Sequence, residues 1–489
     1  MDNIDRGAPM LLLLLSILVI ILTTSTSSAA TTPSSPSHFL EFNVDEAIAG
    51  TKLKHVQEEA EPEQQQEQLE WKVKLKLLHR DKIHHSVTTI SNDHRTRFNA
   101  RIKRDVRRVA FLLRRLSSNN YAEELAEAAA FGSDDVVSGT AEGSGEYFVR
   151  IGVGSPPTYQ YMVIDSGSDI VWVQCQPCDQ CYNQTDPIFN PALSASFTGV
   201  RCPSAVCGQL DGAACHEKRC GYEVSYGDGS STKGTLALET LTVGRTVIRK
   251  TAIGCGHWNE GMFVGAAGLL GLGGGPMSFV GQLGAQTDGA FGYCLLSRGA
   301  VPEGSSGSLR FGRQAMPIGA VWVPLIPNPF FPTFYYVALS GLGVGGLRLN
   351  ISEDVFRITD LGDGGVVMDT GTAVTRLPAA AYNIFRDAFV DQTTNLPRAS
   401  RVSIFDTCYN LSGFVSVRVP TVSFYFSGGQ ILTLPARNFL IPADDIGTFC
   451  FAFAPSPYGL SIIGNVQQEG IQISVDAGNG FVGFGPNVC

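Results

Sequence analysis

One pattern occurs twice in this chain of 489 residues. The segment YMVIDSGSDIVWV around Asp165 is echoed by VVMDTGTAVTRLP around Asp369. Each is followed further along by two apolar residues and a glycine, in GLLGLG ending at Gly273 and in SIIGN ending at Asn465. Chance matches would not keep this order and spacing, so the repeat predicts two similar lobes that each contain one aspartate motif.

The composition favours a β-rich protein. Hydrophobic residues make up 44% of the chain and charged residues 17%, while 54 glycines and 25 prolines break it into short runs. Short apolar runs bounded by turn residues are typical of strands, and helical periodicity is confined to brief stretches such as residues 379–392. We therefore expect an all-β protein with short helices, in which two pseudo-symmetric lobes enclose a cleft.

The two tripeptides that begin at Asp165 and Asp369 carry the predicted chemistry. Asp-Ser-Gly is common in ordinary turns, but here each motif follows an apolar strand and ends in a further hydroxyl residue, in IDSGS and MDTGT. A carboxyl group in such a place is costly unless hydroxyl and backbone donors surround it. Two such loops facing each other would let the carboxylates share one proton, so that one activates a water and the other protonates a carbonyl oxygen. The expected reaction is direct hydrolysis of a peptide bond at acidic pH, without a cofactor.

An apolar run, MLLLLLSILVIIL, occupies residues 10–22. It is short for a membrane span and small residues follow it, which indicates a signal peptide at residues 1–30 that is cleaved near Ala29 or Ala30. An uncleaved anchor remains an alternative, because two aspartates make the preceding region less basic than is usual. The expected destination is the secretory pathway, with the extracellular space or cell wall favoured over the vacuole or endoplasmic reticulum.

Residues 31–140 differ in composition from the rest of the chain, since they lack cysteine and carry blocks of charge. Between residues 95 and 115, nine basic residues stand against one acid, Asp105. This pattern fits a solvated amphipathic helix or a nucleic-acid patch. Because residues 141–489 carry a net charge of −7, we favour a third interpretation, a prosegment that inhibits the acidic body and that acid releases. Its cleavage is expected between about residues 117 and 145, and no nucleic-acid partner is expected.

All 12 cysteines lie after residue 170. An even number in an exported chain predicts six disulfides formed in an oxidising compartment. The run at Cys175, Cys178 and Cys181 also has the spacing of zinc ligands, but no histidine stands at a matching position, so no metal is expected. N-glycosylation sequons, which agree with export, begin at Asn183, Asn350 and Asn410.

With both motifs and their glycine partners in place, residues 141–489 resemble the pepsin-like aspartic proteases along their whole length. The cysteine-rich insert at residues 175–220 is similar to that of the nepenthesin-type plant members. The resemblance implies an N-terminal lobe at residues 141–325 and a C-terminal lobe at residues 326–489. It also implies an aspartic endopeptidase that acts on polypeptides, is inhibited by pepstatin-type compounds and is expected to be a monomer.

The resemblance assigns roles to residues around the two aspartates. Ser168 and Thr372 would hydrogen-bond the outer carboxylate oxygens, and Ser166 and Thr370 would form a hydroxyl lattice below them. The glycines of the two motifs complete the set of supporting residues; they are Gly167 and Gly371.

A hairpin flap over the substrate is a further feature that the resemblance implies. The segment EVSYGDGSSTKG at residues 223–234 fits it. Tyr226 matches the flap tyrosine, Gly227 belongs to the tight turn, and Trp172 matches the tryptophan that steadies that tyrosine.

The resemblance also implies a disulfide pattern and one rival function. The implied pairs are Cys175–Cys178, Cys181–Cys255, Cys202–Cys220, Cys207–Cys215, Cys294–Cys489 and Cys408–Cys450. The rival is a catalytically inactive member that binds or inhibits other proteins, like the plant xylanase inhibitors that share this fold. Because both aspartates, the flap tyrosine and the hydroxyl residues are all present, we favour the protease.

Overall fold

The computed structural model describes most of the chain from residue 38 onward. Residues 39–489 form one compact unit. The described residues are 38–52, 73–80, 93–116, 146–226, 229–261, 263, 265–296, 306–457 and 459–485. The predicted signal peptide and the predicted cleavage region therefore lie outside the described residues. No helix in the described ranges is long and apolar enough to cross a membrane.

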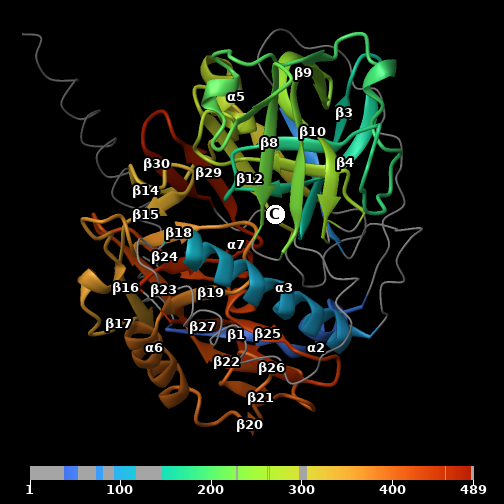
Figure 1. Ribbon diagram of the computed structural model, residues 1–489. Helices are drawn as coiled ribbons and strands as arrows, with labels where there is room; N and C mark the ends of the chain where they lie inside the picture. The colour runs from blue at the N-terminus through green and yellow to red at the C-terminus, as the bar shows by residue number, and fades with distance from the viewer. Residues whose placement is uncertain are drawn as a thin grey trace, which may run out of the picture. The chain divides into compact units, whose positions relative to one another are not determined.

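Strands dominate this unit, in agreement with the predicted β-rich, two-lobed class (Figure 1). The strands of the first lobe are β3 (Tyr147–Val153), β4 (Thr158–Asp165), β5 (Val171–Gln174), β6 (Thr198–Gly199), β7 (Ala214–His216), β8 (Arg219–Ser225), β9 (Ser231–Val243), β10 (Thr246–Glu260) and β11 (Gly268–Gly271). Short apolar runs and turn glycines produce these strands, as the composition predicted.

A central antiparallel sheet contains strands from far apart in the sequence. Its strands, in spatial order, are β2 (Val73–His79), β13 (Gly307–Phe311), β12 (Ala290–Cys294), β29 (Gln472–Asp476), β30 (Phe481–Phe484) and β14 (Val321–Ile326). Its buried side chains belong to the largest apolar cluster of the unit, which includes Phe291, Leu309 and Val475. Burial of such side chains contributes about 1.5–3 kcal/mol each, so the sheet is a stable platform.

The second lobe contains two small sheets, further strands around the aspartate motif, and two α-helices. Its strands are β15 (Tyr335–Val337), β16 (Leu339–Val344), β17 (Leu347–Arg348), β18 (Val366–Met368), β19 (Thr375–Pro378), β20 (Arg398–Ala399), β21 (Cys408–Asn410), β22 (Ser416–Pro420), β23 (Val422–Phe426), β24 (Ile431–Leu434), β25 (Leu440–Pro442), β26 (Thr448–Phe451), β27 (Phe453–Ser456) and β28 (Ser461–Ile463). The small sheets have the orders β17-β16-β23-β24 and β20-β21-β26-β25. Among the described residues from 146 onward, the α-helices are α5 (Phe279–Leu283), α6 (Ala379–Asp391) and α7 (Asn465–Gln468).

The repeated sequence motifs adopt the same arrangement in both lobes. β4 ends at Asp165 and pairs in parallel with β11, where Gly271 lies opposite Asp165. β18 ends just before Asp369 and pairs in parallel with β28, where Ile463 lies opposite Met368. In each lobe the partner strand also pairs antiparallel with the strand after the aspartate loop, β5 or β19. Each aspartate therefore lies at the end of a buried strand, β4 or β18. That strand pairs with the apolar strand that the sequence repeat predicted as its partner, β11 or β28.

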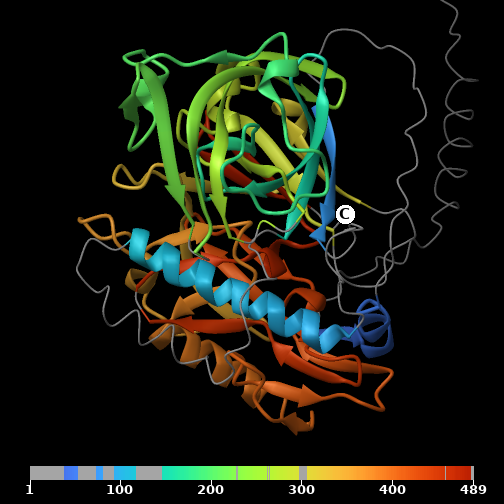
Figure 2. The ribbon, with the colours of Figure 1, turned by 45° about the vertical axis from the view of Figure 1, so that its right-hand side comes forward.

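The described parts of residues 39–116, here called the N-terminal segment, pair and pack with both lobes. Its elements are β1 (Phe39–Asn43), α2 (Val44–Ala49), β2 and α3 (His94–Arg115). β1 pairs with β22 of the second lobe, and β2 lies between β13 and β3. The basic helix expected at residues 95–115 is α3, which runs between the strands of the two lobes (Figures 1 and 2).

The start and burial of α3 follow from its sequence. Asp93 caps the helix by accepting a hydrogen bond from the Thr96 amide at 2.8 Å. One side of α3 is apolar and packs against the second lobe, where its side chains lie among Phe405 and Ala443 or among Phe334 and Ile462. The buried apolar residues of α3 are Phe98, Ile102, Val109, Leu112 and Leu113. The helix is thus a packed element and not a solvated one.

The disulfides of the insert differ from the pairs that the resemblance implied. The structure contains Cys175–Cys255, Cys178–Cys181, Cys202–Cys215 and Cys207–Cys220, so the four implied pairs Cys175–Cys178, Cys181–Cys255, Cys202–Cys220 and Cys207–Cys215 are wrong.

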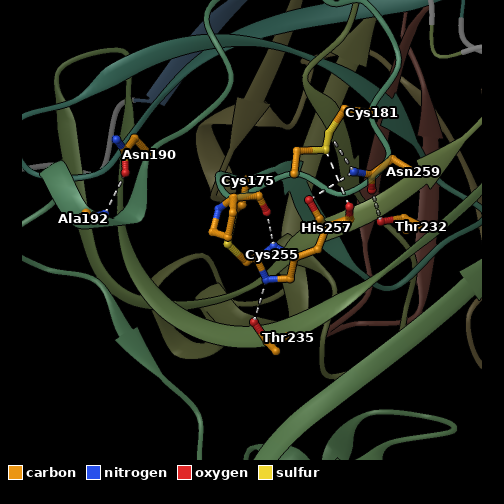
Figure 3. The surroundings of a disulfide bond; sticks show 12 residues. Cys175, Cys181, Asn190, Ala192, Thr232, Thr235, Cys255, His257 and Asn259 are labelled. Carbon is orange, nitrogen blue, oxygen red and sulfur yellow. Dashed lines mark hydrogen bonds between the residues drawn. A yellow bond between two sulfur atoms is a disulfide. The ribbon is translucent and has the colours of Figure 1, made fainter.

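Strand pairing explains the first difference. β5 and β10 run in parallel, and the Cys175 amide donates to the Gly256 carbonyl at 2.9 Å. This brings Cys175 beside Cys255, with their Cα atoms 5.3 Å apart (Figure 3). Cys178 and Cys181 are then left to pair with each other.

The remaining cysteine and glycosylation predictions have mixed outcomes. The predicted Cys408–Cys450 bond is present and joins the two strands β21 and β26. Cys294 is disulfide-bonded, but its predicted partner Cys489 lies outside the described residues. Because the described cysteines of the insert are in disulfides, they are not zinc ligands. The three sequon asparagines are exposed, and their glycosylation stays a prediction.

Candidate active site

Asp165 and Asp369 lie together in the interior, at 3% and 0% exposure. The loops that come after them are tied by reciprocal hydrogen bonds. The Ser166 amide donates to Thr370 Oγ1 at 3.1 Å, and the Thr370 amide donates to Ser166 Oγ at 3.0 Å. The hydroxyl lattice that the resemblance implied is therefore present, although one motif has serine and the other threonine.

Backbone and hydroxyl donors surround the carboxylates, as an ionised group in the interior requires. The Gly167 amide donates to Asp165 Oδ1 at 2.9 Å, and the Gly371 amide donates to Asp369 Oδ1 at 3.2 Å. Thr372 Oγ1 donates to Asp369 Oδ2 at 2.6 Å, as expected. Each motif thus supplies its own carboxylate with donors.

Ser168 departs from the expectation. Its hydroxyl is buried but has no hydrogen-bond partner among the described residues. Both oxygens of the Asp165 carboxylate accept hydrogen bonds from an arginine of α3. The expected bond from Ser168 to Asp165 is not formed in this structure.

The arginine is Arg108, and it lies between the two carboxylates. Its Nη2 atom donates to Asp165 Oδ1 at 2.7 Å and to Asp369 Oδ1 at 2.9 Å. Its Nε atom donates to Asp369 Oδ2 at 3.0 Å, and its Nη1 atom donates to Asp165 Oδ2 at 3.2 Å. One guanidinium therefore binds all four carboxylate oxygens, and its planar fork suits this geometry.

The site is shaped to admit this guanidinium. A Cβ atom at Gly167 would lie 2.4 Å from Arg108 Nη2, and one at Gly371 would lie 3.1 Å from Arg108 Cζ. Burial alone would lower the pKa of Arg108, but the charges of Asp165 and Asp369 hold that pKa above its ordinary value. The cation therefore stays charged, and it occupies the space between the carboxylates.

The spacing of charged residues in the helix, and not only the net charge of the segment, was a sequence signal for Arg108. These residues recur every three or four positions, which places them on one side of α3. In the structure this side is buried. Buried charges at helical spacing require partners elsewhere in the fold. These residues are Arg101, Arg104, Asp105 and Arg108.

A second buried ionic cluster joins α3 to the start of β3. The Glu146 carboxylate accepts from Arg104 Nη2 at 2.7 Å and lies 3.1 Å from Arg101 Nε. It also contacts His79 of β2 at 3.2 Å. Burial opposes its ionisation, but Arg104 and Arg101 hold the pKa of Glu146 well below its usual range. This cluster therefore attaches both β2 and α3 of the N-terminal segment to the Glu146 carboxylate.

Glu469 lies beside this cluster in a different electrostatic setting. Its Oε1 atom accepts a hydrogen bond from the Tyr147 hydroxyl at 3.0 Å and lies 3.5 Å from Arg101 Nη2. Burial raises the pKa of Glu469 to about 7, although Arg101 opposes this change. The pKa values of two neighbouring carboxyl groups are therefore shifted in opposite directions.

The predicted flap residues also come together. β8 and β9 form a hairpin that the Tyr226 amide closes by donating to the Ser230 carbonyl at 2.7 Å. Trp172 Nε1 donates to the Tyr226 hydroxyl at 2.8 Å, and Phe263 packs against both rings. Gly227 lies outside the described residues. Within the described ranges, no group of three or more His, Cys, Asp or Glu side chains could hold a metal ion.

Comparison with known families gives two adjacent matches. Residues 147–313 match the family described as xylanase inhibitor N-terminal, and residues 334–486 match xylanase inhibitor C-terminal. These two ranges contain both aspartate motifs and exclude the N-terminal segment.

Individual relatives carry protease names. The chain is 67% identical to "Protein ASPARTIC PROTEASE IN GUARD CELL 2" of Arabidopsis thaliana over 86% of this chain and 88% of that protein. It is 41% identical to aspartic proteinase nepenthesin-2 of Nepenthes gracilis over 71% and 78%. The crystal structure of basic 7S globulin from soybean matches with a TM-score of 0.56 and 19% identity, over 71% of this chain and 93% of that one. This last likeness concerns the fold alone.

Proposed function

The chain belongs to the family of pepsin-like aspartic proteases, and from this premise we propose that it is an acid endopeptidase made as a self-inhibited precursor. Asp165 and Asp369 form its catalytic pair, and the N-terminal segment belongs to its prosegment. The observation that carries the proposal is the bonding of one α3 guanidinium to both carboxylates. The cation occupies the position between the two carboxylates at which the catalytic water would bind.

Catalysis starts when the guanidinium leaves and a water takes its place between the carboxylates. One carboxylate removes a proton from this water as its oxygen attacks the scissile carbonyl carbon. The other carboxyl group, which carries the shared proton, donates it to the carbonyl oxygen. The tetrahedral intermediate then collapses, the C–N bond breaks, and the amine leaves with a proton from the pair. The hydrogen bonds between Ser166 and Thr370 keep the two carboxylates in the same relative position throughout the reaction.

The proposed prosegment acts by occupying this position. Water and substrate cannot enter while α3 lies in the cleft and Arg108 binds the carboxylates. Cleavage between about residues 117 and 145 would separate α3 from β3, which begins at Tyr147. The apolar contacts of α3 and the buried ion pairs hold the helix, and acid weakens the ion pairs by protonating their carboxylates.

A binding or inhibitor protein is the rival function, and the description of the matching family names xylanase inhibitors. The site gives this rival less support. Both carboxylates are present, Thr372 donates to Asp369, and Trp172 donates to Tyr226. A protein that only binds others has no need to keep all of these contacts.

The proposed function is tested by acidifying the purified precursor and measuring casein cleavage with and without pepstatin. We expect no cleavage near neutral pH, cleavage after acidification, and loss of cleavage with pepstatin. A precursor that stays inert at every pH would contradict the protease assignment. Cleavage that pepstatin does not affect would contradict the assigned class of mechanism.

The ionic cluster at Glu146 predicts the pH at which the prosegment is released. The pKa of Glu146 is lowered in the folded precursor, so its contribution to stability is present above its ordinary value of 4.5 and is lost as the pH falls below this. The pKa of Glu469 is raised to about 7, so its contribution is lost as the pH rises through that range. We expect conversion to begin below about pH 4.5 and not at mild acidity, as measured by gel analysis of the precursor.

The variant Glu146→Gln tests this origin of the pH dependence. It removes the carboxylate that Arg104 and Arg101 share, although Arg101 keeps Glu469 at 3.5 Å. Breaking a buried pair of this kind costs about 3–5 kcal/mol, so conversion should move to higher pH. The matched control is Glu353→Gln, which removes a half-exposed pair with Arg348 that is worth at most about 1 kcal/mol. Unchanged conversion in Glu146→Gln would show that this cluster does not hold the prosegment.

A further inference from the structure

A buried ion pair connects α3 to the second lobe one helical turn before Arg108. Asp105 Oδ2 accepts a hydrogen bond from Arg376 Nη2. Asp105 Oδ1 accepts from the Ala373 amide at 2.6 Å and from the Val374 amide at 2.9 Å. The side chains of Arg376 and Asp105 are 5% and 0% exposed. One carboxylate of the N-terminal segment is thus held by three donors of the protease body.

The other surroundings of these donors are mainly apolar. The cluster that contains Ala373 and Val374 also contains Phe405 and Ala443 of the second lobe. Phe98 and Ile102 of α3 complete this cluster and cover the donors. When α3 leaves, these donors lose both Asp105 and the apolar side chains of α3, and the apolar residues of the second lobe remain around them.

Arg376 loses its carboxylate partner at the same moment. Its remaining described hydrogen bond is from Nη1 to the Val374 carbonyl at 3.2 Å. A guanidinium in an apolar recess without an anion is unfavourable, because its charge is desolvated and unpaired. The two freed backbone N–H groups point to the same acceptor position. Together they form a recess with the shape and charge for one carboxylate group.

The recess lies close to the catalytic pair. Ala373 comes directly after Thr372, whose hydroxyl binds Asp369. Asp105 precedes Arg108 by three residues on the helix, a rise of about 4.5 Å along the axis. An extended peptide rises about 3.3 Å per residue. A substrate side chain that enters the recess therefore belongs to a residue one or two positions from the scissile bond.

We propose that in the activated protease Arg376 and the amides of Ala373 and Val374 bind an aspartate or glutamate side chain of the substrate near the scissile bond. Asp105 of the prosegment occupies the same recess in the precursor and imitates this side chain. This inference rests on the proposed protease function and adds a preference for acidic substrates to it. Arg376 is a specificity-determining residue and has no part in bond cleavage.

The test uses protein that is expressed as the full-length precursor and then activated by acid. Its substrates are a set of fluorogenic peptides. The peptides place glutamate, glutamine, aspartate or asparagine at each of the three positions on either side of one cleaved bond, and kcat/KM is measured for each. At one position we expect the acid to be preferred over its amide by roughly 10- to 100-fold, the effect of a charge-assisted hydrogen bond. The wild-type protein alone is sufficient for this measurement.

Variants then assign the preference to Arg376. Arg376→Gln should remove the preference by lowering kcat/KM for the acidic peptide while leaving the amide peptide nearly unchanged. Arg376→Lys should retain part of the preference, because it keeps the charge but loses the planar fork. A purely structural role would lower kcat/KM for both peptides by the same factor.

The outcomes separate this inference from the proposed function. If casein is cleaved but no peptide shows a preference for acid over amide at the six positions, the proposed recess is wrong and the proposed protease function still holds. A preference that persists in Arg376→Gln would also overturn it. Absence of cleavage of casein and of every peptide would overturn the proposed function, and the inference with it.

Discussion

Replacement of either catalytic aspartate by asparagine, Asp165→Asn or Asp369→Asn, will lower kcat for peptide hydrolysis by about 10³-fold or more. An amide can neither remove a proton from the attacking water nor hold the proton that the pair shares, and general acid–base catalysis alone contributes about 10²–10⁴-fold. The size and shape of the side chain stay the same, so substrate binding should change little. The measurement is kcat and KM on one fluorogenic peptide at acidic pH.

Both variants lose the means to process themselves, so conversion must be separated from catalysis. Each precursor is treated with a trace of active wild-type enzyme, which is then removed by its affinity tag. The matched control is Asp354→Asn, because Asp354 is an exposed aspartate whose carboxylate has a surface pair with Arg357 and an exposed hydrogen bond from Ser352. Full activity in both site variants after processing would show that the catalytic residues lie elsewhere.

The position of the aspartates was predictable because a duplicated motif imposes a duplicated geometry. Two apolar strands ending in Asp-Ser-Gly and Asp-Thr-Gly, each with a distant apolar partner strand, leave few arrangements other than a facing pair. The lattice of Ser166 and Thr370 follows from the same symmetry. The resemblance to a known family supplied their roles.

Other features depended on contacts between distant segments, which sequence patterns do not show. The partners of Cys175 and Cys178 are decided by the parallel pairing of β5 with β10, not by the spacing of the cysteines. Ser168 lacks its expected bond to Asp165, whose oxygens instead accept hydrogen bonds from a helix of the N-terminal segment. The net charge of the segment indicated attraction, but the buried faces of α3 determine which cation reaches the carboxylates.

The variant Arg108→Gln will make the precursor active without acid treatment. Among the described residues, Arg108 is the only cation that pairs with Asp165 or Asp369. Its removal leaves two buried carboxylates facing each other below α3, and breaking a buried pair of this kind costs about 3–5 kcal/mol. This corresponds to roughly 10²- to 10⁴-fold weaker docking of the helix. We expect cleavage of a fluorogenic peptide at a pH where the wild-type precursor is inert, together with conversion at higher pH.

The neighbouring residue supplies the control. Arg107 is exposed on the same helix, so Arg107→Gln removes the same charge from α3 without touching the carboxylates. If inhibition depends on the overall attraction between a basic segment and an acidic body, both variants should convert at the same pH. If it depends on the guanidinium between the carboxylates, only Arg108→Gln should be active early, and Arg108→Lys should fall between it and wild type because it keeps one charge but loses the fork. Equal behaviour of all three variants would assign the inhibition to the apolar packing of α3 instead.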